Sequence, residues 1–134
     1  MRYVLDTNIV AAALNRHPAV IDRFNQVSRN NLLFLPAMAL AELQYGALSS
    51  QRIAENLARI NRILETLIFA PMDRPIAERF GLLKARLRRQ GLTRSDADLL
   101  VASTALEMRA ILVTDDKDLR DGSISELKVE NWLL

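Results

Sequence analysis

Four carboxylates stand beside apolar segments of this sequence, where a charged side chain is unfavourable unless a partner compensates it. Asp6 and Asp116 each follow an apolar, strand-like run. Asp98 opens an apolar helical segment, and Glu42 interrupts an apolar stretch. A divalent cation would compensate all four, and oxygen ligands without His or Cys favour Mg²⁺ or Mn²⁺ over zinc. The pattern therefore predicts a metal-dependent hydrolase that acts on a phosphate backbone, with these four acids as ligands and catalytic groups.

Each acid also has a purely structural interpretation. Asp6 can cap a helix over residues 7–14, and Asp98 can complement a helix N-terminus. Asp116 can belong to a solvated turn together with its acidic neighbours. Glu42 has no Lys or Arg between positions 29 and 52 to pair with, so its alternative is a side chain that reaches water.

Composition limits the chemistry further. The 134 residues are enough for one domain with a core, half of them are hydrophobic, and there is no cysteine for a disulfide, a thiolate zinc site or a nucleophile. His17 is the only histidine and precedes Pro18, so it is expected in a loop, and a two-histidine ribonuclease mechanism is excluded. No apolar run approaches a membrane span, and an acid appears too early for a secretory signal, which predicts a cytoplasmic protein.

Apolar runs and helical periodicity alternate along the chain. Strands separated by helices predict an α/β fold, a parallel central sheet of four to five strands with helices on both faces. The carboxyl ends of such strands meet at one edge, which would bring Asp6, Asp98 and Asp116 together. Strands are expected at 2–5, 32–35, 67–70 and 111–114, with a fifth at 127–130 on an edge; helices are expected at 7–14, 18–28, 37–48, 51–66, 75–90 and from Ser95 to about Arg109.

The net charge of +2 conceals an asymmetry. If the four acids face one pocket, the rest of the chain carries 18 basic and 12 acidic residues, which suits a polyanionic substrate. Basic residues gather just before the Asp96–Asp98 helix start, where they either hold RNA phosphates or form a solvated helix face. They are Lys84, Arg86, Arg88, Arg89 and Arg94.

Five segments, in order along the whole chain, resemble the motifs of PIN-domain nucleases. They are Leu5-Asp6-Thr7-Asn8, Ala41-Glu42-Leu43, Asp98-Leu99-Leu100-Val101-Ala102, Val113 to Leu119, and Val129-Glu130-Asn131-Trp132. The length and the ending are most similar to VapC-type toxins of bacterial toxin–antitoxin pairs. The resemblance implies a single PIN-like domain over residues 1–134.

The resemblance also implies a Mg²⁺-dependent endoribonuclease that inhibits translation, forms a homodimer and is blocked by a cognate antitoxin. Asp6, Glu42 and Asp98 fall on the motifs, and Asp116 matches the fourth acid, with Asp118 a nearby candidate. Asp96 is an additional acid that could support the metal site indirectly, and Leu119 replaces a common aromatic, a change expected to affect packing more than chemistry.

Two other classes of function stay open. A signalling receiver domain is also α/β with acids at strand ends, but it needs an acidic pair after its first strand, where Thr7 and Asn8 stand. A non-catalytic RNA- or protein-binding domain gains nothing from four clustered carboxylates. The sequence does not specify which RNA is cut, or whether one or two ions bind.

Overall fold

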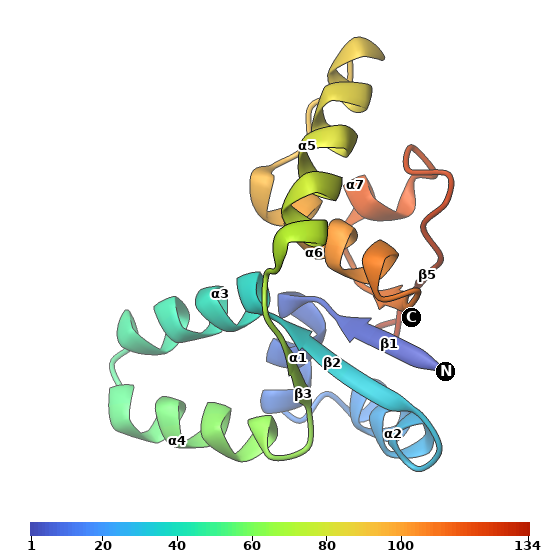
Figure 1. Ribbon diagram of the computed structural model, residues 1–134. Helices are drawn as coiled ribbons and strands as arrows, with labels where there is room; N and C mark the ends of the chain where they lie inside the picture. Colours follow the sequence, from blue (N-terminus) through green and yellow to red (C-terminus); the bar gives the residue numbers. More distant parts are fainter.

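Five parallel strands form the centre of the molecule in the computed structural model, which describes residues 1–134 (Figure 1). Their order across the sheet is β3-β2-β1-β4-β5, and every neighbouring pair is parallel. The predicted α/β architecture is therefore confirmed, including the fifth strand at an edge. The strands are β1 (Arg2–Leu5), β2 (Leu32–Pro36), β3 (Ile68–Ala70), β4 (Ile111–Val113) and β5 (Val129–Glu130).

Seven helices cover the two faces of this sheet. One layer contains α1 (Thr7–Leu14), α2 (Pro18–Ser28), α3 (Ala37–Leu48) and α4 (Ile53–Leu64); the other contains α5 (Arg74–Arg89), α6 (Asp96–Glu107) and α7 (Lys117–Arg120). In Figure 1 the sheet separates the blue-to-green helices from the yellow-to-red ones. Six of the helices agree with the sequence prediction within about two residues at each end. The exception is α7, whose four residues are too few to show a hydrophobic period.

The strands β1, β2 and β4 are apolar on both faces because both faces are buried, whereas Ile68 and Phe69 of the edge strand β3 are exposed. Tyr3 and Leu5 of β1 pack into the core on the α1–α4 side, whereas Val4 packs into the core on the α5–α7 side. β2 alternates in the same way, with Leu33 and Leu35 on one side and Phe34 on the other. This is the expected composition of parallel strands with helices on both sides.

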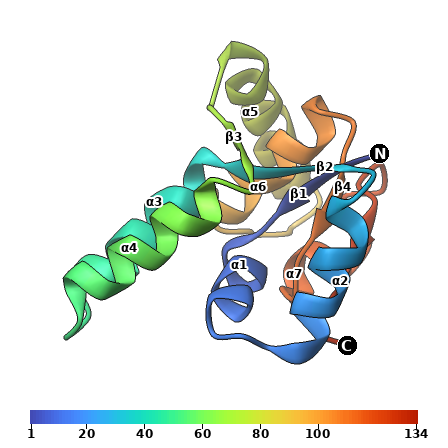
Figure 2. The ribbon, with the colours of Figure 1, turned by 90° about the horizontal axis from the view of Figure 1, so that it is seen from below.

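Helices α3 and α4 lie side by side and project from one edge of the sheet (Figure 2). Ile60 is buried on the inner side of α4, while Tyr45 and Leu48 of α3 are 74% and 56% exposed. The hairpin therefore carries apolar side chains that the rest of the chain does not cover.

The strand order places a topological switch point between β1 and β4. From β1 the chain builds outward through β2 and β3, then returns to add β4 and β5 on the opposite side of β1. In open parallel sheets, ligands bind at the carboxyl ends of the strands that flank such a point. The loops after β1 and β4 are thus the expected location of a ligand-binding site. No helix in the structure has the length and apolar character needed to cross a membrane.

Candidate active site

Asp6 occupies the carboxyl end of β1, and its side chain is only 5% exposed. Its Oδ1 accepts a hydrogen bond from the backbone N–H of Thr7 at 2.8 Å, so Asp6 does cap α1. Its Oδ2 accepts from the Thr114 hydroxyl at 2.7 Å. Burial raises the pKa of Asp6, and the nearby carboxylates of Glu42 and Asp116 raise it further. The capping interpretation is therefore correct but incomplete, because no cation balances this buried charge.

Thr114, directly after β4, connects Asp6 to the acidic segment that contains Asp116. Its fully buried hydroxyl donates to Asp6 and accepts from the backbone N–H of Asp116 at 3.0 Å. Asn8 ties the same loops together, since its Oδ1 accepts from the Asp115 N–H at 3.0 Å and its Nδ2 donates to Asp6 Oδ2 at 3.3 Å. No role was predicted for Thr114 or Asn8 from the sequence; the available signal was a short polar residue within two positions of an acid at a strand end.

Asp98, Asp116 and Asp118 form a second group, with one carboxylate oxygen of each within 4.8 Å of the others. Ser95 begins α6 by accepting from the Asp98 N–H at 3.1 Å, and Asp116 begins α7 by accepting from the Asp118 N–H at 2.9 Å. Burial and the adjacent Asp116 carboxylate raise the pKa of Asp98 to about 6, and the more remote charge of Asp6 acts in the same direction. Asp118, expected only as a neighbouring candidate, lies in this group.

Glu42 lies on α3 and contacts Thr7, the residue that follows Asp6. Its Oε1 accepts from the Thr7 hydroxyl at 2.7 Å, and it forms no ion pair, as expected from the absence of nearby Lys and Arg. The sequence predicts that Asp96 supports the metal site indirectly, but the structure pairs its carboxylate with another group. Its carboxylate is turned toward α5, where it accepts from Lys84 Nζ at 2.8 Å.

Three other residues considered from sequence have structural positions. His17 lies in the loop directly before α2, as expected, and its Nδ1 is buried without a hydrogen-bond partner. Leu119 is 3% exposed in the core on the α5–α7 side, so its role is packing. Asp115 is exposed and accepts from Asn131 Nδ2 at 2.8 Å, which holds it to the C-terminal segment.

The acidic residues fit a hard divalent cation. Asp6, Glu42, Asp98 and Asp116 come from four separate segments, and none of them pairs with Lys or Arg. Opposite oxygens on one Mg²⁺ lie about 4 Å apart, so the group of Asp98, Asp116 and Asp118 needs little movement to share one ion. Burial and the charge of Asp116 both raise the pKa of Asp98, and a bound cation would offset both effects.

Comparison with known proteins identifies the family of this chain. The family model of the PIN domain matches residues 3–123. The chain belongs to the PIN-domain family. Among relatives of this PIN domain, ribonuclease VapC2 of Rickettsia felis is 34% identical over 134 residues, which cover 98% of each chain. Ribonuclease VapC2 of Haemophilus influenzae is 33% identical, with 99% of each chain covered.

The PIN-domain fold is also shared with a solved complex. A chain of VapBC2 from Rickettsia felis, crystallised with a DNA fragment from its promoter, superimposes with a TM-score of 0.91 at 32% identity. The match covers 98% of this PIN domain and 99% of that chain. The family resemblance inferred from sequence is therefore confirmed along the whole chain, and it is of the VapC type.

Proposed function

We propose that this protein is a Mg²⁺-dependent endoribonuclease, the toxic component of a toxin–antitoxin pair, which cleaves RNA phosphodiester bonds and so inhibits translation. The observation that carries the proposal is the group of acids at the β1/β4 switch point, which no cationic side chain neutralises. The relatives named ribonuclease VapC2 support RNA as the substrate class. Mn²⁺ is an expected substitute, because it takes the same oxygen ligands.

The acidic residues have different proposed roles in this reaction. Asp6 and Asp98 are proposed as principal metal ligands, and Asp116 completes the pocket with Asp118 beside it. When bound, the ion would lower the pKa of a coordinated water and offset the charge that develops on the phosphate. Glu42 would hold a second ion or orient the attacking water from the α3 side. Thr114 keeps the Asp6 carboxylate in place by its 2.7 Å hydrogen bond.

The proposal includes partners. The Rickettsia felis neighbour was solved as a VapBC2 complex, which supports a cognate antitoxin for this chain. A homodimer is proposed because Tyr45, Met72 and Leu82 are more than half exposed and offer apolar surface to a second copy. A cytoplasmic location is part of the proposal because the substrate is cellular RNA.

A cleavage assay with total RNA tests the activity. The purified protein should produce discrete RNA ends with Mg²⁺ and none with EDTA, and end mapping would identify the target. Asp6→Asn should abolish cleavage without unfolding the chain, because the amide oxygen can still accept from Thr7 N–H and the amide nitrogen can donate to the Thr114 hydroxyl oxygen. Asp22→Asn is the matched control, since this acid is exposed on α2, has no role in the proposed site and should leave cleavage in place.

Two results would contradict the proposal. Undiminished Mg²⁺-dependent cleavage by the Asp6→Asn chain would remove Asp6 from the machinery. RNA binding without any cleavage, in Mg²⁺ and in Mn²⁺, would favour the non-catalytic binding domain instead, and a stable aspartyl phosphate would favour a receiver.

A further inference from the structure

A polar cavity lies between the C-terminal half of α5 and the start of α6, the helix that carries Asp98. It has a volume of about 250 Å³, and four charged side chains line it: Lys84, Arg88, Arg94 and Asp96. We call it the α5–α6 pocket. With three cations and one anion it is opposite in charge to the neighbouring acidic site.

Only part of that positive charge is used within the protein. Arg94 is 9% exposed, and it donates to the Asp118 carbonyl at 3.1 Å and to the Asp121 carboxylate at 2.5 Å. Its side chain therefore has a fixed position and connects the pocket to the segment around α7. Arg88 is exposed and forms no ion pair or side-chain hydrogen bond. Its charge is available to a ligand.

Lys84 is held only by Asp96, and the two side chains are 36% and 63% exposed. An ion pair this open to water contributes little to stability, so another anion can replace the carboxylate at small cost. A phosphate group offers more acceptor oxygens than a carboxylate and matches the fork of an arginine beside it.

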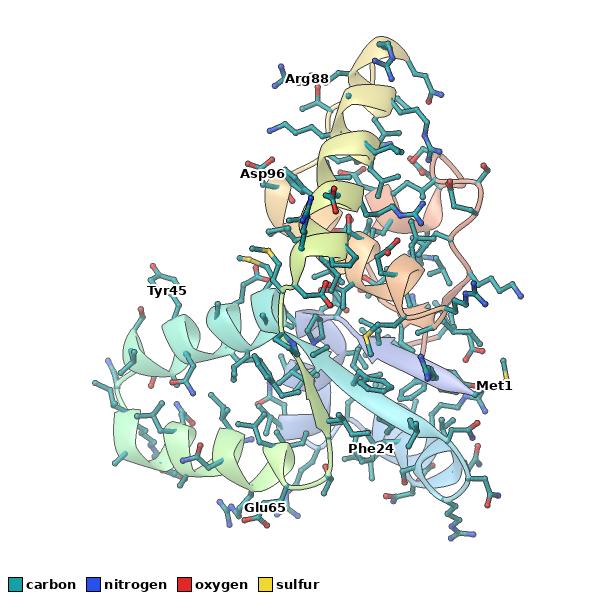
Figure 3. All side chains as sticks on the ribbon, viewed as in Figure 1. Met1, Phe24, Tyr45, Glu65, Arg88 and Asp96 are labelled. Carbon is teal, nitrogen blue, oxygen red and sulfur yellow. The ribbon has the colours of Figure 1, made fainter.

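The start of α6 connects the two sites. Asp96 and Asp98 are two residues apart in its first turn, and side chains at that spacing do not face each other. Asp98 faces the acids, and Asp96 faces α5. Figure 3 shows Asp96 and Arg88 on the arm that α5 and the start of α6 form above the sheet. A strand crossing the start of α6 would thus meet both sites.

We propose that the α5–α6 pocket binds a backbone phosphate of the RNA substrate close to the scissile one, through Arg88 and Lys84. This inference rests on the proposed ribonuclease function. The incoming phosphate takes the place of the Asp96 carboxylate on Lys84, and Arg94 is a positioning residue that holds the pocket against α7. Such contacts fix the strand's register without reading its sequence.

Electrostatics favour an RNA strand as the occupant. The acidic site repels a polyanion wherever the metal does not neutralise it, so a strand bound there needs cations within reach. The α5–α6 pocket supplies them at the start of α6, the same helix that carries Asp98. An acidic peptide is the competing ligand, but its binding would not depend on a pocket that lies next to the acids at β1 and β4.

Binding measured separately from cleavage tests the proposal. The Asp6→Asn chain, which cannot cut, is titrated with a fluorescently labelled single-stranded RNA in Mg²⁺, and anisotropy is followed between about 50 and 200 mM salt. Arg88→Gln in that background should weaken binding by roughly 3- to 10-fold and reduce the salt slope by about 0.7. Arg89→Gln is the matched control, because it removes the same charge from the next residue, outside the pocket.

Asp96→Asn provides a test of opposite sign. Removing the carboxylate frees Lys84, so RNA should bind more tightly by roughly 2- to 5-fold. In the cleavage-competent chain, Arg88→Gln should raise KM and leave kcat nearly unchanged, as expected for a residue that holds the strand away from the reacting atoms.

Three outcomes would overturn the pocket assignment. Equal weakening by Arg88→Gln and Arg89→Gln would indicate general surface charge, and no tightening by Asp96→Asn would mean that Lys84 does not exchange partners. Loss of affinity for an acidic peptide but not for RNA would identify a protein ligand. Failure of the unsubstituted protein to cleave RNA would contradict the proposed function, while the binding series would still decide the pocket.

Discussion

Replacing Asp98 by Asn should make the metal-free protein more stable at neutral and alkaline pH. Burial, followed by the charge of Asp116, raises the pKa of Asp98 from an ordinary value of 3.8 to about 6, and no cation pairs with this carboxylate. A raised pKa in the folded state means that ionisation destabilises the fold. The penalty is absent below pH 3.8 and complete above about pH 6.

The size of the effect follows from this shift. Two pKa units correspond to about 3 kcal/mol for a fully buried group, at about 1.4 kcal/mol per unit. Asp98 is only half-buried, so solvent screening reduces the expected gain to about 1 kcal/mol. The loss of a negative charge from the first turn of α6 lowers the expected gain by about 0.5 kcal/mol, to about 0.5 kcal/mol. Asp96→Asn loses a charge from the same turn, so the difference between the two variants stays at about 1 kcal/mol.

Urea unfolding in EDTA at pH 8 and at pH 4 measures the difference. Asp98→Asn should be more stable than the unsubstituted chain at pH 8, nearly equal at pH 4, and unchanged in the slope m. Asp96→Asn is the control: its exposed pair with Lys84 predicts a change below about 0.5 kcal/mol. A less stable Asp98→Asn chain at pH 8, or an equal gain from Asp96→Asn, would refute the idea that the acids repel one another here.

Four further predictions follow from the same structure. Mg²⁺ should raise the free energy of unfolding, by about 2.7 kcal/mol at 100 times its Kd, and EDTA should reverse this in thermal melts; no shift would argue against a metal site. Thr114→Val should cost about 1–2 kcal/mol in urea melts and lower kcat, because its buried hydroxyl serves both Asp6 and the Asp116 N–H. Leu35→Ala, at a fully buried position in β2, should cost about 2–5 kcal/mol by the same measurement. Arg86 lowers the pKa of Glu126 to about 2. This ion pair therefore stabilises the fold above pH 4.5, and the effect is lost as the pH falls toward 2. In urea melts, Arg86→Gln should cost about 0.5–1 kcal/mol at pH 7 and little at pH 2.

The elements were predictable because local signals at their ends are strong. Pro36 ends the run that forms β2, and the serine hydroxyl of Ser95 begins α6 by accepting from Asp98 N–H. The strands were recognisable because they are apolar on both faces and are separated by amphipathic helices. These signals fix where each element starts and ends, and they also indicate that Asp6 and Asp116 follow strands.

What lies between the elements was less predictable. α7 has too few residues for a period, and its start depends on the side chain of Asp116. The contact of Glu42 with Thr7 joins residues 35 positions apart, and nothing in either local sequence specifies it. The turn of Asp96 toward Lys84, away from Asp98, depends on how α5 packs against α6. Such contacts need tertiary structure, which a pattern along one chain does not contain.

The same sheet that makes the fold stable also concentrates the charge that the site needs. Because β4 pairs with β1, Thr114 comes within hydrogen-bond distance of Asp6 although 108 positions separate them. Pairing in any other order would leave Asp6 as an ordinary helix cap and Asp116 at an unrelated turn. The repulsion among the acids is thus a consequence of strand order, offset by the apolar cores on both faces of the sheet. A divalent ion would offset the repulsion. The loss of one carboxylate should therefore raise stability in EDTA and lower activity in Mg²⁺.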